Sequence, residues 1–353
     1  MHRIKIAVIF GGNSTEYEVS LQSAYSVLEH INKEKYEIIP VGITRNGDWY
    51  HVTGGIEKLM EKMKDNTWDQ DKENLRQAAV SPNPSVKGLL EFSKQGWSVI
   101  KTDLAFPVLH GKNGEDGTIQ GIFEMAGIPV IGCGTLSSAL CMDKDRAHKL
   151  VSQAGISVPE SVTFDSEGRK EACAAIKKLS YPLFVKPVRA GSSFGITKVM
   201  EKSQLDAAID AAFEHDAEVI IEEAVDGFET GCAVLGIHDL TVGRVDEIEL
   251  SEGFFDYTEK YTLKTSKIHM PARIDAETEK RIQKTAVKIY KVLGCSGFAR
   301  VDMFYTASGE IVFNEVNTIP GFTSHSRYPN LMKGIGLSFS QLLDKLTGLY
   351  TQG

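Results

Sequence analysis

The sequence has few of the features that mark secreted, membrane-spanning or nucleic-acid-binding proteins. It holds five cysteines in 353 residues, an odd number without C-x-x-C spacing, which argues against a disulfide framework and against a zinc site. The N-terminal apolar stretch is too short for a secretory signal, and no apolar run reaches about 18 residues. No block of Lys or Arg accompanies the formal charge of −8. We therefore expect a cytoplasmic protein that spans no membrane and binds no nucleic acid.

What the sequence does contain is an alternation of apolar strands and amphipathic helices. Residues 4–10 are an apolar run that ends at a glycine pair, and a helical pattern follows over 19–31. Asn46-Gly47 predicts a hairpin turn between two strands, and 103–110 reads as another buried strand. This order predicts a doubly wound, parallel-sheet N-terminal domain. Residues 52–100 are polar and weakly periodic, so we expect an irregular or partly helical excursion there.

The rest of the chain predicts two further domains. One helix is expected from about Leu136 to a stop at Gly155, followed by short strands and helices of an α+β module. The remainder is rich in strands, with a polar, aromatic loop at 251–269 and a long amphipathic helix. We expect an α/β and α+β fold with an N-terminal α/β domain at 1–138, a central domain at 139–226 and a C-terminal domain at 227–353.

The strongest indication of chemistry lies in the two strands of residues 298–317. A hairpin there would place Asp302, Glu315 and Asn317 at neighbouring positions. Oxygen ligands without His or Cys favour Mg²⁺ or Mn²⁺, shared with substrate phosphates. Arg300 would lie on the same face and could neutralise charge on a transferred phosphoryl or acyl group. The alternative is a set of structural salt bridges among these four side chains.

Two segments of the central domain are candidates for nucleotide binding. In KPVRAGSSFG (186–195), small residues would let N–H groups approach phosphate oxygens, and Lys186 adds charge. An ordinary hairpin turn is the alternative. The strand end VIIEEAVDGFE (219–229) could bind adenine through backbone groups and the ribose through an acid; the residues concerned are Glu222, Glu223, Val225 and Glu229. A solvated strand end is the alternative here.

Two segments of the N-terminal domain follow buried strands, at the edge where open α/β sheets bind ligands. In FGGNSTEYEVS (10–20), Thr15 and Glu18 fit a capping box, whereas Glu16 has no such structural explanation and could hold a substrate ammonium. The glycine-rich loop HGKNGEDGTIQG (110–121) brings His110 to the same edge. A purely structural histidine is the alternative to one that contacts substrate.

Taken in order, these segments resemble the D-alanine–D-alanine ligase family of ATP-grasp enzymes. The family patterns HGxxGEDGxxQG, KPxxxGSSxG, EKY and NExNTxPGxTxxS are all present, and the similarity covers nearly the whole chain, with 52–100 the weak region. The resemblance implies an ATP-grasp fold, a homodimer, and a reaction that uses ATP and two Mg²⁺ (or Mn²⁺). The carboxylate of D-alanine attacks the γ-phosphate, and the amine of a second D-amino acid then attacks the acyl phosphate.

The resemblance also implies roles for individual residues. Glu16 would bind the first ammonium in a hydrogen-bonded triad with Ser192 and Tyr261, the last from the loop that closes over the site and excludes water. Lysines would contact the phosphates of ATP: Lys144, Lys186 and Lys260. Oxygen ligands would hold the two metal ions: Asp302, Glu315 and Asn317. Arg300 and the Gly321 N–H would stabilise the oxyanion. Ser326 would bind the carboxylate of the second substrate, and His110 would lie beside the substrates.

Two residues depart from the D-alanine–D-alanine ligases. Arg327 stands where leucine is usual, and Phe255 stands where tyrosine is common. Together with Asp246, an acid that would hold the arginine, they resemble the VanG-type D-alanine–D-serine ligases of vancomycin resistance. A guanidinium could donate to a serine hydroxyl directly or through water, although Arg327 could instead point into solvent. Tyr261 follows the loop lysine where D-lactate ligases carry histidine, which favours an amino acid as second substrate.

We therefore predict an ATP-dependent ligase that joins D-alanine to D-serine and supplies a modified peptidoglycan precursor for glycopeptide resistance. A housekeeping D-alanine–D-alanine ligase is the nearest alternative, and an ATP-grasp ligase for another acid is a third. A nucleotide-binding module without turnover should have lost its metal ligands, which are present here. An oxidoreductase would need a ribose-binding acid after the second strand, and EIIPVGITRNG supplies none.

Overall fold

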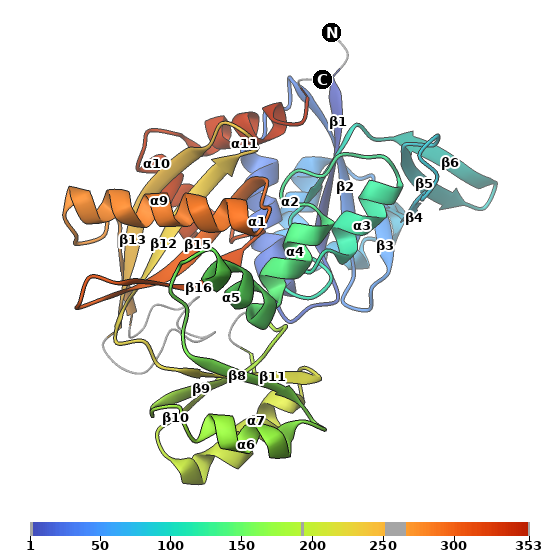
Figure 1. Ribbon diagram of the computed structural model, residues 1–353. Helices are drawn as coiled ribbons and strands as arrows, with labels where there is room; N and C mark the ends of the chain where they lie inside the picture. The colour runs from blue at the N-terminus through green and yellow to red at the C-terminus, as the bar shows by residue number, and fades with distance from the viewer. Residues whose placement is uncertain (1–2, 192–193, 251–265, 352–353) are drawn as a thin grey trace.

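A computed structural model describes residues 3–191, 194–250 and 266–351 of the chain. Across these residues, helices surround three β-sheets of seven, four and five strands (Figure 1). Each sheet belongs mainly to one third of the chain, as the prediction of three domains requires, although the exact boundaries stay predictions. In this described part of the chain, no helix is long and apolar enough to cross a bilayer.

The N-terminal sheet is mixed, with the strand order β6-β5-β4-β3-β2-β1-β7. The three strands β2, β1 and β7 are parallel, as the alternation of strands and helices predicts, and β3 to β6 continue the sheet antiparallel. The strands are β1 (Ile4–Gly11), β2 (Tyr36–Ile43), β3 (Trp49–Val52), β4 (Leu75–Val80), β5 (Gly88–Ser93), β6 (Gly96–Lys101) and β7 (Leu104–Pro107). The helices of this region are α1 (Tyr17–His30), α2 (Ile56–Lys64) and α3 (Thr118–Met125), with 3₁₀ turns η1 (Trp68–Gln70) and η2 (Lys72–Asn74).

Residues 52–100 are more regular than expected. The expectation of an irregular excursion is wrong for 75–101, where β4, β5 and β6 extend the sheet as an antiparallel meander. The segment is anchored by Trp68, which is fully buried and donates from Nε1 to the Tyr17 hydroxyl at 2.7 Å. Its ring packs on Gly42, where an added Cβ would come within 2.3 Å of it. The predicted hairpin at Asn46-Gly47 is confirmed.

The helix predicted from Leu136 to Gly155 is two helices, α4 (Thr135–Met142) and α5 (Lys144–Gln153). The break lies at Asp143, whose extended backbone ends α4 and whose side chain accepts from the Arg146 N–H at 2.9 Å, capping α5. An acid at this position ends α4, because its side chain accepts from an N–H group in the first turn of α5. Both helices pack on the C-terminal sheet through one shared hydrophobic cluster.

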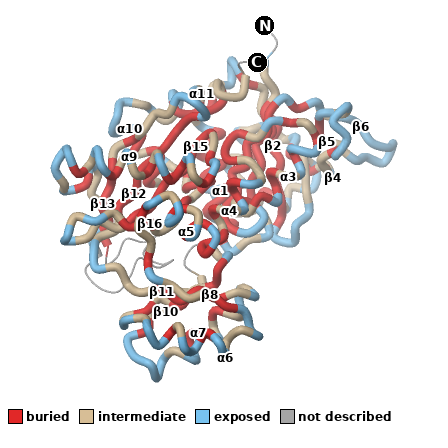
Figure 2. The backbone as a smooth tube through the Cα atoms, viewed as in Figure 1, coloured by how far each residue is buried: buried red, intermediate tan, exposed pale blue. Residues whose placement is uncertain are grey.

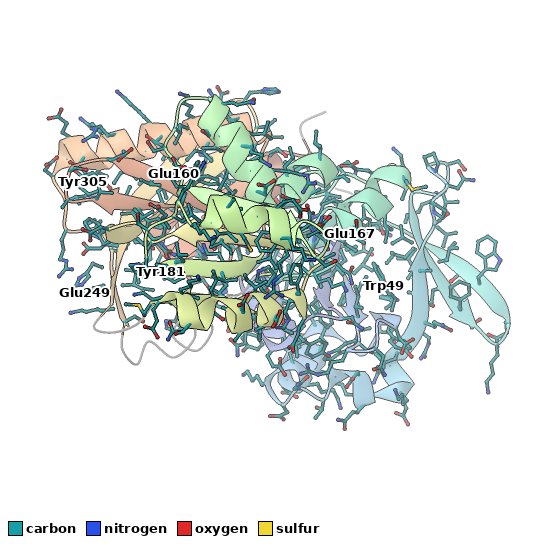
Figure 3. The ribbon with its side chains drawn as sticks, turned by 60° about the horizontal axis from the view of Figure 1, so that its bottom comes forward. Trp49, Glu160, Glu167, Tyr181, Glu249 and Tyr305 are labelled. Carbon is teal, nitrogen blue, oxygen red and sulfur yellow. The ribbon has the colours of Figure 1, made fainter. Side chains whose placement is uncertain are left out.

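The central module is a four-stranded antiparallel sheet with the order β10-β9-β11-β8. Its strands are β8 (Ser161–Asp165), β9 (Leu183–Pro187), β10 (Thr197–Val199) and β11 (Glu218–Glu223), and its helices are α6 (Arg169–Ile176), α7 (Leu205–Phe213) and the 3₁₀ turn η3 (Lys202–Gln204). It has its own hydrophobic cluster and projects from the rest of the molecule (Figure 1). Figure 3 views the module from its outer side, with Trp49 of the N-terminal sheet to one side and Tyr305 of the C-terminal sheet to the other.

The C-terminal sheet is antiparallel with the order β14-β13-β12-β15-β16. Its strands are β12 (Gly227–Gly236), β13 (Thr241–Leu250), β14 (Ser266–His269), β15 (Gly297–Thr306) and β16 (Ile311–Asn317), and its helices are α9 (Ala276–Val292), α10 (Arg327–Lys333) and α11 (Phe339–Gly348). The prediction found α9, α11 and the β15–β16 hairpin but not α10, which begins at Arg327 itself. Buried residues lie in both this sheet and the N-terminal one (Figure 2), and one hydrophobic cluster contains side chains from both.

Candidate active site

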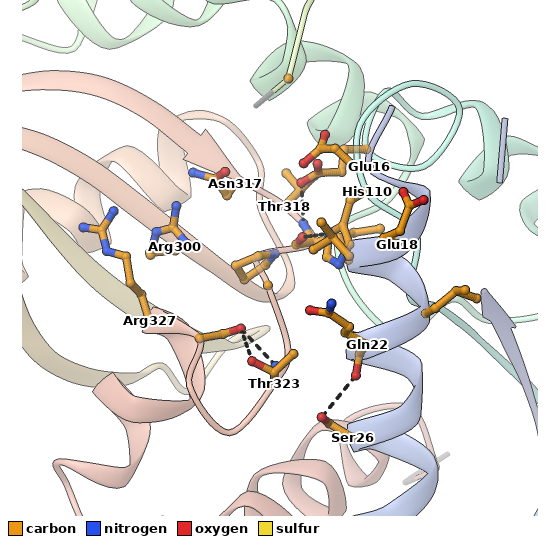
Figure 4. Close-up of a pocket in the computed structure, with 18 of the residues that line it drawn as sticks. Glu16, Glu18, Gln22, Ser26, His110, Arg300, Asn317, Thr318, Thr323 and Arg327 are labelled. Atoms are coloured by element: carbon orange, nitrogen blue, oxygen red, sulfur yellow. Dashed lines mark hydrogen bonds between the residues drawn. The ribbon is translucent and has the colours of Figure 1, made fainter. Parts of the chain in front are cut away.

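A cavity of about 640 Å³ lies where the loops of all three regions meet (Figure 4). Helix α1 and the 110–115 loop form one wall, β15, β16 and the 318–327 loop form another, and the ends of α4 and of the 190–191 loop close a third side. The predicted site residues that line it are Glu16, His110, Lys144, Arg300, Glu315, Asn317, Gly321, Ser326 and Arg327. Four further predicted residues, Ser192, Phe255, Lys260 and Tyr261, lie outside the described residues.

The β15–β16 hairpin places the predicted metal ligands as expected. Asp302 pairs with Glu315 across the ladder, and Asn317 donates from Nδ2 to the Asp302 carboxylate at 2.9 Å. A β-bulge follows Asp302, so the strand bends at this point. Arg300 donates from Nε and Nη2 to the same carboxylate, each at 2.8 Å, so the salt bridge considered as an alternative is also present.

The donor set of this hairpin fits a hard divalent cation. Two carboxylates and one carboxamide oxygen are the ligands that Mg²⁺ or Mn²⁺ takes when nucleotide phosphates supply the rest. Among the described residues no three His, Cys, Asp or Glu side chains converge on one point, so the site lacks a cluster that would hold a metal alone. A metal here would therefore depend on phosphate oxygens for part of its coordination.

Arg327 is the centre of a buried ion network, not a solvent-exposed residue. Its Nε and Nη2 donate to the two Asp246 oxygens at 2.8 Å each, and its Nη1 donates to Glu229 at 3.0 Å. Nη2 also lies 3.5 Å from Asp302. Burial lowers the pKa of Arg327, but Asp246 and Asp302 raise it, and the balance lies well above the ordinary value. The side chain is therefore a fixed cation at 9% exposure, and the alternative that it points into solvent is wrong.

The neighbouring backbone is shaped to admit this arginine. An added Cβ on Gly231 would lie 2.3 Å from Arg327 Nη2, so only glycine leaves room for the guanidinium. The Gly231 N–H donates to Asp246 at 2.8 Å, which holds the acid in the geometry that meets Arg327. The predicted contact between Asp246 and Arg327 is thus present in the structure, and a part for Asp246 in substrate binding stays a prediction.

The predicted nucleotide-binding side chains form a second buried network on the central sheet. Lys186 donates to Glu222 at 2.5 Å, and the other oxygen of Glu222 lies 3.5 Å from His148 Nδ1. Burial raises the pKa of Glu222, but the positive charge of Lys186 and the nearby His148 lower it by more. The pKa of Glu222 therefore lies below its usual value. Lys144 donates to the Ala190 carbonyl at 2.8 Å, at the base of the 186–195 loop.

The strand end 219–229 is divided between two places in the molecule. Glu222 and Glu223 end β11, and Glu223 accepts from the Ser180 N–H at 2.7 Å. Glu229 lies on β12 and accepts from Arg327, next to the substrate-side network. Its expected contact with a ribose stays a prediction, as does the contact of Val225 with adenine.

Glu16 lies between two glycine-containing loops. Added Cβ atoms on Gly111 and Gly191 would come within 2.6 and 2.9 Å of its Oε2, so these loops approach the carboxylate closely because they lack side chains. The predicted capping box at Thr15 and Glu18 is wrong: Glu16 stands at the N-cap of α1 without a side-chain cap. Glu18 instead forms a salt bridge with Arg45.

His110 and Glu115 hold the 110–115 loop against the 318–322 loop. His110 Nδ1 lies 2.9 Å from the Ile319 carbonyl and Nε2 lies 3.0 Å from the Ser23 hydroxyl. Glu115 accepts from the N–H groups of Gly111 and Ile319 at 2.9 and 3.1 Å. Burial, reinforced by the nearby charge of Glu16, raises the pKa of Glu115 to about 8.

Sequence reasoning missed three residues of these networks: Ser23, Glu115 and His148. Glu115 lies within the HGxxGEDG pattern, but spacing alone does not show whether it or Asp116 turns inward. In the structure the Asp116 carboxylate accepts from the N–H groups of Asn113 and Thr118, both near it in the chain. Ser23 and His148 look like ordinary helix residues in sequence, and only the long-range contacts reveal them.

Comparisons with known proteins place this arrangement among ligases. Two family models match, "D-ala D-ala ligase N-terminus" over residues 5–133 and "D-ala D-ala ligase C-terminus" over 150–348. The vancomycin B-type resistance protein VanB of Enterococcus faecalis is 47% identical, with 99% of each chain covered. The crystal structure of the VanG D-Ala:D-Ser ligase from Enterococcus faecalis has a TM-score of 0.93 at 73% identity, covering 99% of this chain and 100% of that one. That of the Bacillus anthracis D-alanine–D-alanine ligase complexed with ATP has a TM-score of 0.72 at 29% identity, covering 98% and 97%.

Proposed function

The chain belongs to the D-alanine–D-alanine ligase family, and on this premise we propose that it joins D-alanine to D-serine at the expense of ATP. It is an ATP-dependent ligase of the EC 6.3.2 type. One observation carries the choice of D-serine, namely the buried Arg327 held by Asp246 at the edge of the cavity. The product would be a peptidoglycan precursor dipeptide of the kind used in vancomycin resistance.

The nucleotide end of the site is assigned to the lysines and the β15–β16 hairpin. Lys144 and Lys186 would bind phosphate oxygens, and Lys260 would do so from the loop. Asp302, Glu315 and Asn317 would hold Mg²⁺ or Mn²⁺, which offsets repulsion between the attacking carboxylate and the triphosphate. In the structure Lys186 is paired with Glu222, so binding of ATP would exchange that partner for phosphate.

The substrate end is assigned to residues from both walls of the cavity. Glu16 would bind the ammonium of the first D-alanine, completed by Ser192 and Tyr261. Arg300 and the Gly321 N–H would stabilise the tetrahedral oxyanion that forms when the second amine attacks. Ser326 accepts from the Thr323 N–H at 3.0 Å, and its hydroxyl would bind the carboxylate of the second substrate.

Selection of D-serine follows from how Arg327 is held. A guanidinium has five N–H donors, and within the described residues three of those on Arg327 donate to Asp246 and Glu229, while Nη2 also lies 3.5 Å from Asp302. Nη1 carries two N–H groups and donates to a single carboxylate among the residues that the structure describes, so its second N–H can donate to a hydroxyl, directly or through water. A site that offers a donor to a hydroxyl penalises an analogue that leaves the donor unpaired. Water can fill that position for D-alanine, so we expect preference and not exclusion.

The proposal is tested by ligation in an equimolar mixture of D-alanine and D-serine with ATP and Mg²⁺, with the dipeptides resolved by mass. D-alanyl-D-serine is expected to dominate, and to be lost in the double variant Asp246→Asn/Arg327→Leu, which removes the selector without leaving Asp246 charged and buried. Arg169→Leu is the matched control, because Arg169 also binds two carboxylates but lies on the outer face of the central module. Dominant D-alanyl-D-alanine in the wild type would instead identify a housekeeping ligase.

We further propose that the protein works in the cytoplasm as a homodimer. Both statements follow from the family resemblance. Light scattering on the purified chain tests the second, and a mass of one chain at micromolar concentration would contradict it.

A further inference from the structure

The loop of residues 319–322, which carries the Gly321 N–H, is held mainly from the opposite wall of the cavity. Three buried side chains of the N-terminal region reach its backbone. Glu115 accepts from the Ile319 N–H at 3.1 Å, and His110 Nδ1 lies 2.9 Å from the Ile319 carbonyl. On the other side of Gly321, the Ser23 hydroxyl accepts from the Phe322 N–H at 3.2 Å. These contacts flank Pro320 and Gly321 on both sides along the chain.

The directions of the hydrogen bonds through Ser23 are determined by the groups at either end. The Ile319 carbonyl can only accept, so His110 carries its proton on Nδ1 and presents a lone pair on Nε2. Ser23 then donates its proton to Nε2, 3.0 Å away, and uses its own lone pair to accept from the Phe322 N–H. Burial lowers the pKa of His110, which favours this neutral form. Each donor in this series of hydrogen bonds, namely the Phe322 N–H, the Ser23 hydroxyl and the His110 Nδ1–H, therefore has an acceptor.

We propose that Ser23 is a positioning residue for ligation, which holds the 319–322 loop so that the Gly321 N–H faces the developing oxyanion. This inference rests on the proposed function, because it assigns the N–H of Gly321 to the oxyanion. Ser23 is fully buried in α1 and does not line the cavity. Its effect on the reaction therefore passes through the backbone of the loop.

The position of this backbone has little tolerance. An added Cβ on Gly321 would lie 3.0 Å from the Ser326 hydroxyl, so the Gly321 backbone and the predicted carboxylate-binding serine are nearly in contact. Without the Ser23 hydroxyl, the Phe322 N–H and His110 Nε2 would both lose a partner inside the protein. The loop would relax by a fraction of an ångström, and displacements of about 1 Å at a reacting centre cost on the order of 100-fold in rate.

The test compares Ser23→Ala with Ser20→Ala in the whole enzyme. Ser20 is the matched control because it is also fully buried in α1, and its hydroxyl also bridges two backbone groups, the Gly11 N–H at 2.8 Å and the Val108 carbonyl at 2.5 Å. Neither of these hydrogen bonds reaches the 319–322 loop. For Ser23→Ala we expect kcat to fall about 10- to 100-fold with the KM for ATP within about twofold of wild type. Ser20→Ala should lose comparable thermal stability with a kcat within about threefold of wild type.

The outcomes separate the inference from the function on which it rests. If Ser23→Ala does not fold, Ser23→Cys keeps the volume of the side chain with a much weaker hydrogen-bonding group, and it should show the same selective loss of kcat. Equal losses of kcat in the Ser23 and Ser20 variants would overturn the positioning role while leaving the ligase intact. A wild-type enzyme that forms no dipeptide would overturn the proposed function, and this inference with it.

Discussion

At the scale of single residues, the site is a set of buried charges that compensate one another. Asp302 is 1% exposed and lies between Arg300 and Arg327, and Asp246 is equally buried beneath Arg327. Buried pairs of this kind add little net stability when intact, because desolvation offsets their attraction. Removing one member is costly, because it leaves its partner charged and dehydrated. The network therefore constrains which substitutions the site can accept.

Arg327→Leu alone should destabilise the fold by about 3–5 kcal/mol, since Asp246 would remain buried without its cation. The double variant Asp246→Asn/Arg327→Leu should recover most of that loss, because the asparagine oxygen can still accept from the Gly231 N–H. Urea denaturation measures both. Arg169→Leu, whose partners Asp206 and Asp210 have side chains 89% and 67% exposed, should cost less than about 1 kcal/mol. A single variant no less stable than the double would show that Asp246 finds another partner.

Glu115 should make the stability of the protein fall as the pH rises. Its pKa is about 8 in the folded protein against 4.5 in a model peptide, so between these values the folded state holds a proton that the unfolded chain releases. The contribution of Glu115 to the free energy of unfolding is complete below pH 4.5. It declines as the pH rises toward 8, with a limiting slope of about 1.4 kcal/mol per pH unit. Melting temperatures at pH 5.5 and 8.5 measure it. Glu115→Gln should flatten the difference, whereas Glu171→Gln, on an exposed face of α6, should keep it.

The residues that could be identified from the sequence are those placed by strand alternation or by a family motif. Asp302, Glu315 and Asn317 follow from strand alternation, and the pairing of Asp246 with Arg327 follows from resemblance. Thr15 and Glu18 have capping-box spacing, but Glu18 instead pairs with Arg45, 27 residues away. Sequence reasoning fails where the partner is remote, as it is for Ser23 and Phe322, which are 299 residues apart.

At the scale of elements, the break between α4 and α5 has a direct bearing on the site. The apolar pattern continues through Asp143, so periodicity alone predicts one helix there. The cap redirects the chain so that α5 starts at Lys144, whose ammonium contacts the Ala190 carbonyl. In the same way, α10 begins at Arg327, so its first residue supplies the proposed selector. Two helix starts, of which only that of α5 has a side-chain cap, therefore place two of the predicted site residues.

Asp143→Ala should weaken both stability and ATP binding. It removes the cap on the Arg146 N–H and the ion pair with the Arg146 guanidinium at 2.5 Å, for a loss of about 1–2 kcal/mol. The KM for ATP should rise several-fold, because the turn that carries Lys144 loses its anchor. Ser338→Ala removes the capping box of α11, which does not line the cavity, and should cost similar stability with an unchanged KM. An unchanged KM in both variants would separate the cap from nucleotide binding.

In residues 52–100 the sequence pattern does not predict the strands that the structure contains. β5 and β6 pair mostly with each other, and much of their surface is exposed, so they carry no clear apolar alternation. Their place in the sheet is set by β4, which joins them to β3, and by buried side chains that include Trp68 and Leu89. One tryptophan in a polar stretch has no periodicity to reveal it. The strands that do have a regular pattern, β2, β1 and β7, lie at the other, largely buried end of the same sheet.

At the scale of the whole molecule, the hydrophobic clusters do not follow the three sheets. One cluster joins the N-terminal and C-terminal sheets, where the Phe298 ring lies 6.3 Å from Phe106 and 5.6 Å from both Phe322 and Tyr328. The central module has a separate cluster around β9 and β11. The two outer regions should therefore unfold together and the central module independently, which would allow the module to move over ATP while the opposite wall of the cavity stays rigid.

Hydrogen exchange followed by mass spectrometry tests this division with two core truncations. Phe298→Ala should cost about 3–5 kcal/mol and speed exchange in β1 and β15 together, although the substitution lies in β15 alone. Ile221→Ala removes an equally buried side chain from β11 and should speed exchange in β9 and β11 while β1 and β15 keep their protection. Because both variants create a cavity in a packed core, they differ chiefly in the cluster that they weaken. Faster exchange confined to β15 in Phe298→Ala would mean that the two outer sheets unfold separately, and the cavity wall would then be only as rigid as the hydrogen bonds from Ser23, His110 and Glu115 make it.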